Sequence, residues 1–374
     1  MLDHIQSGTP AEKALTSWAR ASRFAGSKDR AAVRDHVFDV LRRRRSLSVM
    51  GGGDAGRALV LGLLRDQGID PMTIFGAGGH APAALTADEL AAGNAPAEDD
   101  LADLPDWLIR RFQASLGADA PAAAAALRQR ADVFLRVNVV RATPTAAQQL
   151  LQDDGVETIP VDGLQTALRV TSGARRVAAS RAYTQGWVEL QDASSQAIIH
   201  ALPLLQTGRI LDYCAGGGSK ALAMAAHAPG AQVFAHDISA ARMKDIPERA
   251  GRAGVDVSII TDPAKAAPFD LILCDAPCSG SGTWRRAPQA KWDLTPDRLA
   301  QLCAIQEQIL TQAAKLLRPG GILSYATCSV LTEENADQIS GFLGRMPSWA
   351  CLHQQQFLPN SDGDGFFVAV LEKD

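Results

Sequence analysis

The sequence predicts an α/β protein in which a large carboxyl-terminal domain with a mostly parallel sheet follows a smaller α/β module and an amino-terminal helical domain. Two observations support this prediction. From Trp187 onward, strand-like and helical segments alternate with short loops, which is typical of a parallel sheet covered by helices on both faces. Between Pro10 and Leu64, apolar residues instead recur at intervals of three and four, which indicates helices.

Length and composition narrow the class of protein. A chain of 374 residues exceeds one ordinary domain, so several domains are expected. Apolar residues make up 47% and charged residues 21%, close to the average of soluble globular proteins. No apolar run approaches the length of a bilayer span, and the first residues lack the features of a secretory signal. We therefore expect a cytoplasmic protein without a membrane partner.

Changes in composition predict the domain boundaries. A stretch rich in Ala, Gly, Pro and acidic residues interrupts the helical pattern and is read as a linker. After it, a helical pattern precedes the strand-like VFLRVNVV, a helix over 143–151, and strands around Val156 and Leu168. The predicted parts are a helical domain over 1–80, a linker over 81–106, a small α/β module over 107–185 and the large α/β domain over 186–374.

The large domain is predicted to place its ligands at one edge of the sheet, because ligands of parallel sheets bind beyond the carboxyl ends of the strands. Its expected strands and helices are, in order, RILDYC, SKALAMAAHA, QVFAHD, AARMKDIPERAGRAG, VSIIT, FDLILCD, a helix over 297–317 and GILSYATCS.

Charge is distributed unevenly along the chain. A net charge of -4 argues against a generally basic nucleic-acid-binding protein. Residues 1–50, however, carry ten Lys or Arg against five acidic residues, including the run from Arg42 to Arg45. This run is either a local nucleic-acid-binding surface or an ordinary solvated helix face, and the sequence leaves both interpretations open.

All six cysteines follow residue 213, which is unlike the disulfide framework of a secreted fold. We therefore predict free thiols. Cys274 and Cys278 lack the further ligands of a structural zinc site, so no metal is expected. Cys274 and Cys303 are interpreted as small buried hydrophobic residues.

The segment ILDYCAGGGSK predicts a nucleotide-type cradle between a buried strand and a helix. Glycines let the backbone approach a ligand closely, and the start of the helix offers free N–H groups. The spacing matches neither a P-loop nor the dinucleotide fingerprint, and a tight strand-to-helix turn is the alternative. The candidate cofactor-binding residues here are Cys214, Ala215, Gly216, Gly217, Gly218, Ser219 and Lys220.

Two aspartates at later strand ends extend this site. Asp237 follows the next strand, where a carboxylate can accept hydrogen bonds from both ribose hydroxyls. This position favours a cofactor that contains adenosine. Asp262 follows VSIIT and is a candidate partner of an adenine amino group, although a strand-end aspartate often only caps a helix.

Two thiols are predicted at the ends of neighbouring strands. In DLILCDAPCSGSGTWRR, Asp275 and Cys278 follow one strand, and Cys328 follows the next in SYATCSV. Both strand ends point toward the predicted ligand crevice. Two cysteines there, one of them beside a carboxylate, are difficult to explain by core packing alone.

These motifs resemble those of the Sun/RsmB-type RNA cytosine-5 methyltransferases. DYCAGGGSK is similar to the family's cofactor loop, DAPCSGSGTWRRAPQAKW to its proline–cysteine motif and YATCSVLTEENADQI to its threonine–cysteine motif. GWVELQDASSQAI and DGFFVAVLEK also match, so the resemblance is strongest from Gly186 to Lys373. More weakly, PDWLIRRF with FLRVN resembles the family's RNA-binding module, and RFAGSKDRAAVRDHVFDVLRR resembles the NusB-like helical domain of the RsmB branch.

The resemblance implies a Rossmann-like methyltransferase domain that uses S-adenosylmethionine, with Arg242 and Asp275 added to the cofactor-binding residues. It implies that Cys328 adds to carbon 6 of a cytosine, that Asp275 hydrogen-bonds the ring, and that Cys278 serves the release of the enzyme. The implied substrate is RNA, in particular small-subunit ribosomal RNA, bound by a monomer. The predicted RNA-binding residues are Arg136, Arg285, Arg286 and Lys291.

Some alternatives stay open at this point. DNA cytosine methyltransferases use the cysteine of their proline–cysteine motif as the nucleophile, which would exchange the roles of Cys278 and Cys328. A transfer RNA substrate, or a non-catalytic RNA-binding or ribosome-assembly protein on a methyltransferase scaffold, also fits. The scaffold interpretation draws on the cofactor loop, where Gly217, Gly218, Ser219 and Lys220 stand in place of the family's Pro-Gly-Gly-Lys. A serine at a positive-φ position is expected to weaken cofactor binding. The helical domain also looks short for a full NusB-like fold.

Overall fold

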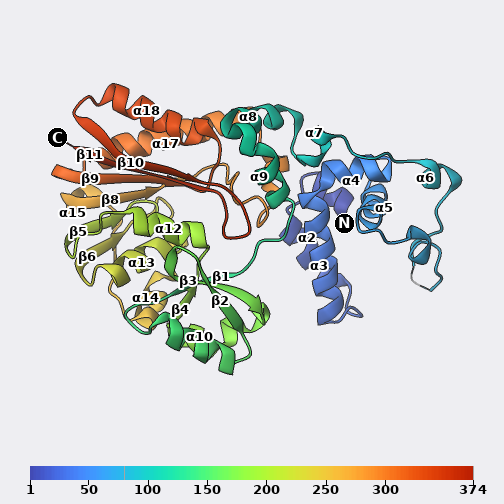
Figure 1. Cartoon of the computed structure of the whole chain (residues 1–374), viewed down its shortest axis with the longest axis horizontal. Helices are drawn as coiled ribbons and strands as arrows, with labels where there is room; N and C mark the ends of the chain where they lie inside the picture. The colour runs from blue at the N-terminus through green and yellow to red at the C-terminus, as the bar shows by residue number, and fades with distance from the viewer. Residues whose placement is uncertain (80, 374) are drawn as a thin grey trace. The chain divides into compact units, whose positions relative to one another are not determined.

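The computed structural model describes residues 1–79 and 81–373, which form two compact units (Figure 1). The first unit comprises Met1–Arg130 and the separate segment Trp284–Thr295. The second contains the remaining described residues. The predicted boundaries at His80 and Asp374 lie outside the described residues.

The first unit is helical, as the apolar spacing predicted. Val37 and Val40 of α3 pack with Leu47 of α4 and Leu59 of α5 in one buried cluster. Its helices are α1 (Leu2–Gln6), α2 (Ala11–Ala21), α3 (Ser27–Arg42), α4 (Arg44–Gly51), α5 (Gly56–Asp66), η1 (Pro71–Thr73), α6 (Ala87–Ala91), α7 (Glu98–Leu101), α8 (Asp106–Leu116), η2 (Gly117–Asp119), α9 (Ala120–Leu127) and α16 (Ala290–Asp293). Within the described ranges, no single helix has the length and apolar composition of a membrane span, and α4 and α5, bent by 93°, reach these criteria only as a pair.

The structure divides the chain differently from the predicted boundary at residue 106. The predicted linker contains α6 and α7, and the following helices α8 and α9 belong to the helical unit instead of the α/β module. Asp103 explains the difference. Its fully buried carboxylate accepts hydrogen bonds from the backbone N–H and hydroxyl of Ser46 at 2.9 and 3.0 Å and pairs with Arg128 at 2.7 Å. Buried charges are retained where such partners surround them, so this contact ties the segment to the helices before it.

The small α/β module contains an antiparallel sheet in the order β2-β3-β1-β4. Its elements are β1 (Phe134–Val137), α10 (Pro144–Asp153), β2 (Glu157–Val161), β3 (Leu164–Ser172), η3 (Ala174–Ala179), α11 (Arg181–Thr184) and β4 (Val188–Leu190). The sheet extends past the predicted boundary at residue 185, because Val188 of β4 pairs with Val137 of β1.

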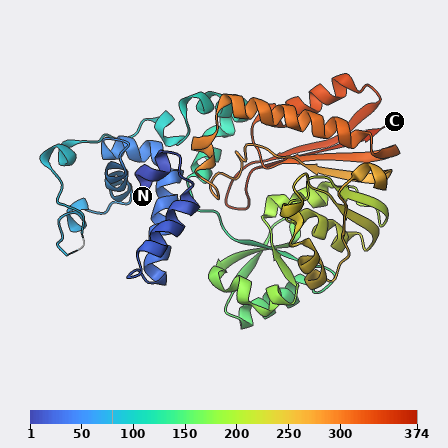
Figure 2. The ribbon, with the colours of Figure 1, turned by 180° about the vertical axis from the view of Figure 1, so that it is seen from behind.

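The second unit also holds the large sheet, whose order is β10-β11-β9-β8-β5-β6-β7. Both views show α12, α13 and α14 on one face and α17 and α18 on the other (Figures 1 and 2). The elements are α12 (Ala193–Ala201), β5 (Thr207–Asp212), α13 (Ser219–His227), β6 (Gly230–Ala235), η4 (Ala240–Met243), α14 (Ile246–Ala253), β7 (Ser258–Ile259), α15 (Pro263–Ala266), β8 (Phe269–Asp275), α17 (Pro296–Ala314), β9 (Leu317–Thr327), η5 (Thr332–Glu334), α18 (Ala336–Arg345), β10 (Trp349–Phe357) and β11 (Phe366–Lys373).

The predicted mostly parallel, helix-covered sheet is confirmed. β5, β6, β7, β8 and β9 pair in parallel, and β11 pairs antiparallel with both β9 and β10. The two carboxyl-terminal strands were not among the predicted strands, and β7 is reduced to two residues. Because β8 and β9 are parallel neighbours, residues that follow them leave the sheet at the same edge.

Candidate active site

The two predicted thiols meet beyond the ends of β8 and β9. β8 ends at Asp275 and β9 at Thr327, so that Cys278 lies in the loop after one strand and Cys328 directly after the other. Their sulfur atoms are 3.4 Å apart, and both side chains are partly buried. Residues 50 positions apart in the sequence thus form one pair of thiols within hydrogen-bonding distance.

The environment makes Cys328 the more acidic member of this pair. A hydrogen bond from the Cys278 thiol lowers the pKa of Cys328, and Thr283 and the Lys220 ammonium act in the same direction against burial and the charge of Asp275. The pKa of Cys278 is raised well above its ordinary value by the same hydrogen bond, by burial and by the charge of Glu334. Since the thiolate is the reactive form of cysteine, the arrangement favours a Cys328 thiolate beside a Cys278 thiol.

This asymmetry predicts how alkylation of Cys328 depends on pH. Because its pKa is lowered, Cys328 should stay a thiolate, and react with iodoacetamide, to lower pH than an ordinary cysteine of pKa about 8.5. Replacing Cys278 by Ala removes the donor and should move the midpoint of the pH–rate curve upward. Mass spectrometry of the alkylated Cys328 peptide over a pH series measures both midpoints. Equal midpoints in the two proteins would contradict the assigned direction of the hydrogen bond.

A lysine and an aspartate lie beside the thiols. Lys220 of α13 donates to the Asp275 carboxylate at 2.6 Å. Burial alone would lower the pKa of Lys220, but Asp275 and Asp212 raise it above its ordinary value. Burial, together with the charge of Asp275, raises the pKa of the enclosed Asp212 to about 7. The Asp275 side chain keeps 29% of its surface exposed, which leaves this carboxylate accessible to a ligand.

The glycine loop between β5 and α13 requires glycine at two positions. Gly216 and Gly218 have φ values of 51° and 81°, and a Cβ at Gly218 would lie 2.7 Å from Ile246. Ser219, by contrast, is the first residue of α13 and has no positive φ. The prediction that this serine strains the loop is therefore wrong, because the left-handed residue is the glycine before it. The hydroxyl of Ser219 instead accepts a hydrogen bond from Arg249 at 3.0 Å.

Asp237 closes the other side of the loop. Its buried carboxylate accepts hydrogen bonds from the backbone N–H groups of Gly216 and Ser239, each at 2.9 Å, and pairs with Arg242 at 2.9 Å. Asp237 and Arg242 therefore hold the loop that was predicted to bind the cofactor. Asp262 is exposed and accepts a hydrogen bond from the backbone N–H of Ala264 at 3.1 Å, so it caps α15, as the alternative interpretation of this residue predicted.

Arg249 of α14 contacts the loop and was missed by the sequence analysis. It donates to the carbonyl of Gly217 as well as to Ser219, and it pairs with the buried carboxylate of Glu189 at 2.9 Å. Glu189 lies on β4 of the small sheet and also pairs with Arg252. Arg249 and Glu189 are 60 positions apart in the sequence, and no motif spacing connects them. Only the folded structure shows that they form a pair.

Three of the four predicted RNA-binding residues are buried. Arg136 is 2% exposed and donates to Gln191 at 2.6 Å, and its burial lowers its pKa to about 10. Arg285 is 4% exposed. Lys291 is 1% exposed and donates to the carbonyl of Arg42 at 2.7 Å, and burial lowers its pKa to about 7. The structure corrects these predictions, since side chains enclosed in this way do not present their charge to a phosphate. Arg286 is exposed.

The basic run in the helical unit has structural contacts. Arg42 is buried and pairs with Asp39 at 2.9 Å, and Arg43 pairs with Asp66. Arg44 lies over the ring of Trp292 at 5.2 Å. Arg45 pairs with Asp100 at 2.9 Å and with Asp106. These contacts stabilise the helical unit, and because Arg42 is buried and Arg43, Arg44 and Arg45 are half-buried, the run differs from the solvated helix face that was one of the two interpretations.

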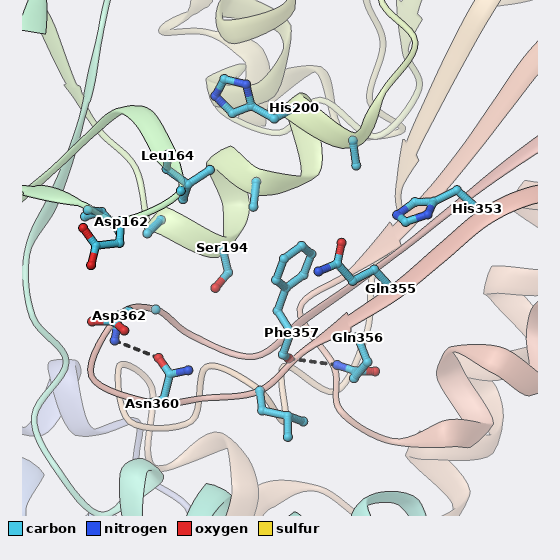
Figure 3. A pocket seen from close by; sticks show the side chains of 17 residues that line it. Asp162, Leu164, Ser194, His200, His353, Gln355, Gln356, Phe357, Asn360 and Asp362 are labelled. Atoms are coloured by element: carbon cyan, nitrogen blue, oxygen red, sulfur yellow. Dashed lines mark hydrogen bonds between the residues drawn. The ribbon is translucent and has the colours of Figure 1, made fainter.

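A pocket of about 600 Å³ lies elsewhere in the second unit. Figure 3 shows His200 of α12 and His353 of β10 apart from each other in the lining, with the ring of Phe357 below both in this view. The turn between β2 and β3 contributes Asp162 to the lining. None of the predicted site residues lines this pocket.

The strand order, the glycine loop after β5 and the acid after β6 define the Rossmann-like fold of S-adenosylmethionine-dependent methyltransferases. The family model "16S rRNA methyltransferase RsmB/F" matches residues 199–372, and "Methyltr_RsmF/B-like, ferredoxin-like domain" matches residues 104–177. The chain therefore belongs to the RsmB/F family of methyltransferases.

Similar proteins agree with this assignment. Ribosomal RNA small subunit methyltransferase B of Citrobacter koseri is 38% identical over 285 residues, which cover 72% of this chain and 66% of that protein. The Klebsiella pneumoniae protein of the same name is also 38% identical, with the same coverage. The chain thus matches slightly less than two thirds of the length of these relatives.

Solved structures show the same fold. The structure of PH0851 covers 99% of this chain and 96% of its own, with a TM-score of 0.77 at 22% identity. NSun6 from Pyrococcus horikoshii, solved with SFG, covers 72% of this chain and 98% of its own, with a TM-score of 0.64 at 18% identity.

Proposed function

We propose that this chain methylates carbon 5 of a cytosine in RNA, with small-subunit ribosomal RNA as the substrate. The distance of 3.4 Å between the sulfur atoms of Cys278 and Cys328, with Asp275 and Lys220 beside them, is the observation that carries this proposal. The relatives at 38% identity are named ribosomal RNA small subunit methyltransferase B, which supports the choice of substrate.

The residues around the glycine loop fit S-adenosylmethionine. Gly216 and Gly218 have positive φ and pack so closely on Arg242 and Ile246 that no Cβ fits, which fixes the loop. The buried carboxylate of Asp237 accepts a hydrogen bond from the backbone N–H of Gly216. These residues would hold the adenosine part of the cofactor, and Lys220 would keep Asp275 in place next to it. The bound cofactor supplies a methyl group attached to a positively charged sulfur. This sulfur is a good leaving group because it departs as a neutral thioether.

The thiols then have separate roles. Carbon 5 of cytosine is a weak nucleophile, and addition of the Cys328 thiolate at carbon 6 increases the electron density at carbon 5. Asp275 hydrogen-bonds the ring and stabilises the adduct. Cys278 serves the release step, in which the proton at carbon 5 leaves and the bond to Cys328 breaks.

The substrate cytosine must be single-stranded or flipped out, because these groups cannot reach a base inside a duplex. The exposed Arg286 remains the proposed phosphate contact among the four predicted residues. We also propose that the protein acts as a monomer in the cytoplasm.

Bisulfite sequencing of total RNA from cells with and without the gene tests this function. A cytosine of the small-subunit ribosomal RNA should resist conversion only when the gene is present. If the protected cytosine lies in transfer RNA instead, the substrate is transfer RNA and the proposed ribosomal RNA substrate is wrong. The proposal would be overturned if the same cytosines were protected with and without the gene and a calorimetric titration detected no binding of S-adenosylmethionine. Both results together would support the non-catalytic scaffold.

A further inference from the structure

The loop that carries Cys278 is held in place by side chains at both of its ends. Cys328 follows the last residue of β9, whereas Cys278 lies three residues beyond the end of β8. On one side of Cys278, Gln306 of α17 donates to the carbonyl of Pro277 at 3.0 Å. On the other side, Ser279 contacts a buried glutamate, Glu334.

Glu334 has no exposed surface, and its carboxylate is enclosed by hydrogen-bond donors. Its Oε1 accepts from the backbone N–H of Ser279 at 2.8 Å and from Gln306 at 3.1 Å, and its Oε2 accepts from the Ser279 hydroxyl. The hydroxyl of Tyr325 on β9 donates to the carbonyl of Glu334 at 2.7 Å, which fixes the backbone. A carboxylate buried with this set of donors is a strong and directional anchor.

The position of Glu334 in the chain links the two thiols. The connection between β9 and α18 begins with Cys328 and contains Glu334 in the short helix η5. The first residue of this connection is thus Cys328, and Glu334 near its other end binds Ser279, the neighbour of Cys278. We propose that Glu334 is a positioning residue that sets the place of Cys278 against Cys328 and thereby the rate of the release step. This inference rests on the proposed function.

The release step shows why position matters. In the methylated adduct, the C5–H bond breaks and its electron pair forms the C5–C6 double bond. The C6–Sγ bond breaks at the same time, and its electron pair leaves on the sulfur of Cys328. The proton passes to the Cys278 thiolate, whose own proton went to solvent after adduct formation. The products are a Cys328 thiolate and a Cys278 thiol. At a pH where Cys328 is fully ionised, a misplaced Cys278 slows this step without affecting the first addition.

The test is a single-turnover reaction in which the covalent protein–RNA complex is followed by denaturing electrophoresis. Glu334→Gln keeps the size of the side chain but replaces one acceptor by a donor. It should form the complex at close to the wild-type rate and resolve it roughly 10- to 100-fold more slowly, in keeping with the loss of a hydrogen bond to a charged group. Ser279→Ala removes the hydroxyl contact alone and should slow resolution in the same direction.

Tyr325→Phe is the matched control, because it removes a buried hydrogen bond to the same residue without touching the carboxylate. It should change the ratio of complex decay to complex formation much less than Glu334→Gln does, because the carboxylate keeps its own hydrogen bonds. A purely structural role would lower both rates and the melting temperature together in Glu334→Gln and Tyr325→Phe. Normal complex decay in both folded Glu334→Gln and Ser279→Ala would overturn the inference.

The Cys278→Ala protein distinguishes failure of the role of Glu334 from failure of the proposed function. If it accumulates the complex and Glu334→Gln does not, only the role of Glu334 is wrong. If neither wild type nor Cys278→Ala forms a complex or 5-methylcytosine, the proposed function fails, and the inference fails with it.

Discussion

The Cys328→Ala protein is expected to form no covalent complex with RNA and to transfer methyl groups at least about 1000-fold more slowly than wild type. The physical reason is that the ring of cytosine becomes reactive at carbon 5 only after a thiolate adds at carbon 6. Cys328 is the thiol whose pKa the site lowers, chiefly through the hydrogen bond from Cys278. Transfer of a radiolabelled methyl group from S-adenosylmethionine to RNA measures the loss.

Cys351→Ala is the control for this experiment, since Cys351 is an exposed cysteine on β10. Its activity should equal that of wild type. A Cys328→Ala protein that becomes trapped on RNA would reverse the assignment, because the nucleophile would then be Cys278, as in the DNA cytosine methyltransferases.

The Cys278→Ala protein is expected to methylate its RNA once and then remain covalently attached to it. Addition at carbon 6 and methyl transfer proceed from the Cys328 thiolate, and loss of the Cys278 hydrogen bond raises the pH at which this thiolate forms. Release, in contrast, needs a group that accepts the proton from carbon 5. Most of the enzyme should therefore migrate with the RNA on a denaturing gel, and steady-state turnover should fall by roughly 100-fold or more, within the range of a lost acid–base group.

The double variant Cys278→Ala/Cys328→Ala serves as its control and should show no covalent complex. Wild-type turnover by Cys278→Ala would mean that another group performs the release. In that case the closeness of the two sulfur atoms would have no role in the reaction.

Sequence patterns predicted the parts of the site that depend on strand ends. Alternating strands and helices indicated a parallel sheet, and residues after neighbouring parallel strands must leave it at one edge. Asp275, Cys278 and Cys328 are therefore close together in the structure, and Asp237 lies against the glycine loop. The family motifs then supplied the roles that spacing alone left open between the two cysteines.

Side-chain environments could not be predicted in this way. Arg136 and Lys291 look like surface charges in the sequence, but tertiary contacts bury both of them. Ser219 was expected to have a positive φ, but it is the first residue of α13, and the positive φ belongs to Gly218. Arg249 reaches the loop from a helix that carries no motif, and its partner Glu189 belongs to another sheet. These features depend on how distant segments pack, which periodicity and spacing do not encode.

The proposed mechanism depends most on which sulfur atom bonds to the substrate. The Cys278→Ala protein should be incubated with RNA and S-adenosylmethionine, digested with protease and nuclease, and analysed by tandem mass spectrometry. A methylated cytidine attached to the peptide that contains Cys328 is the predicted result. A nucleotide attached to any other cysteine, such as Cys214 or Cys303, would contradict the mechanism.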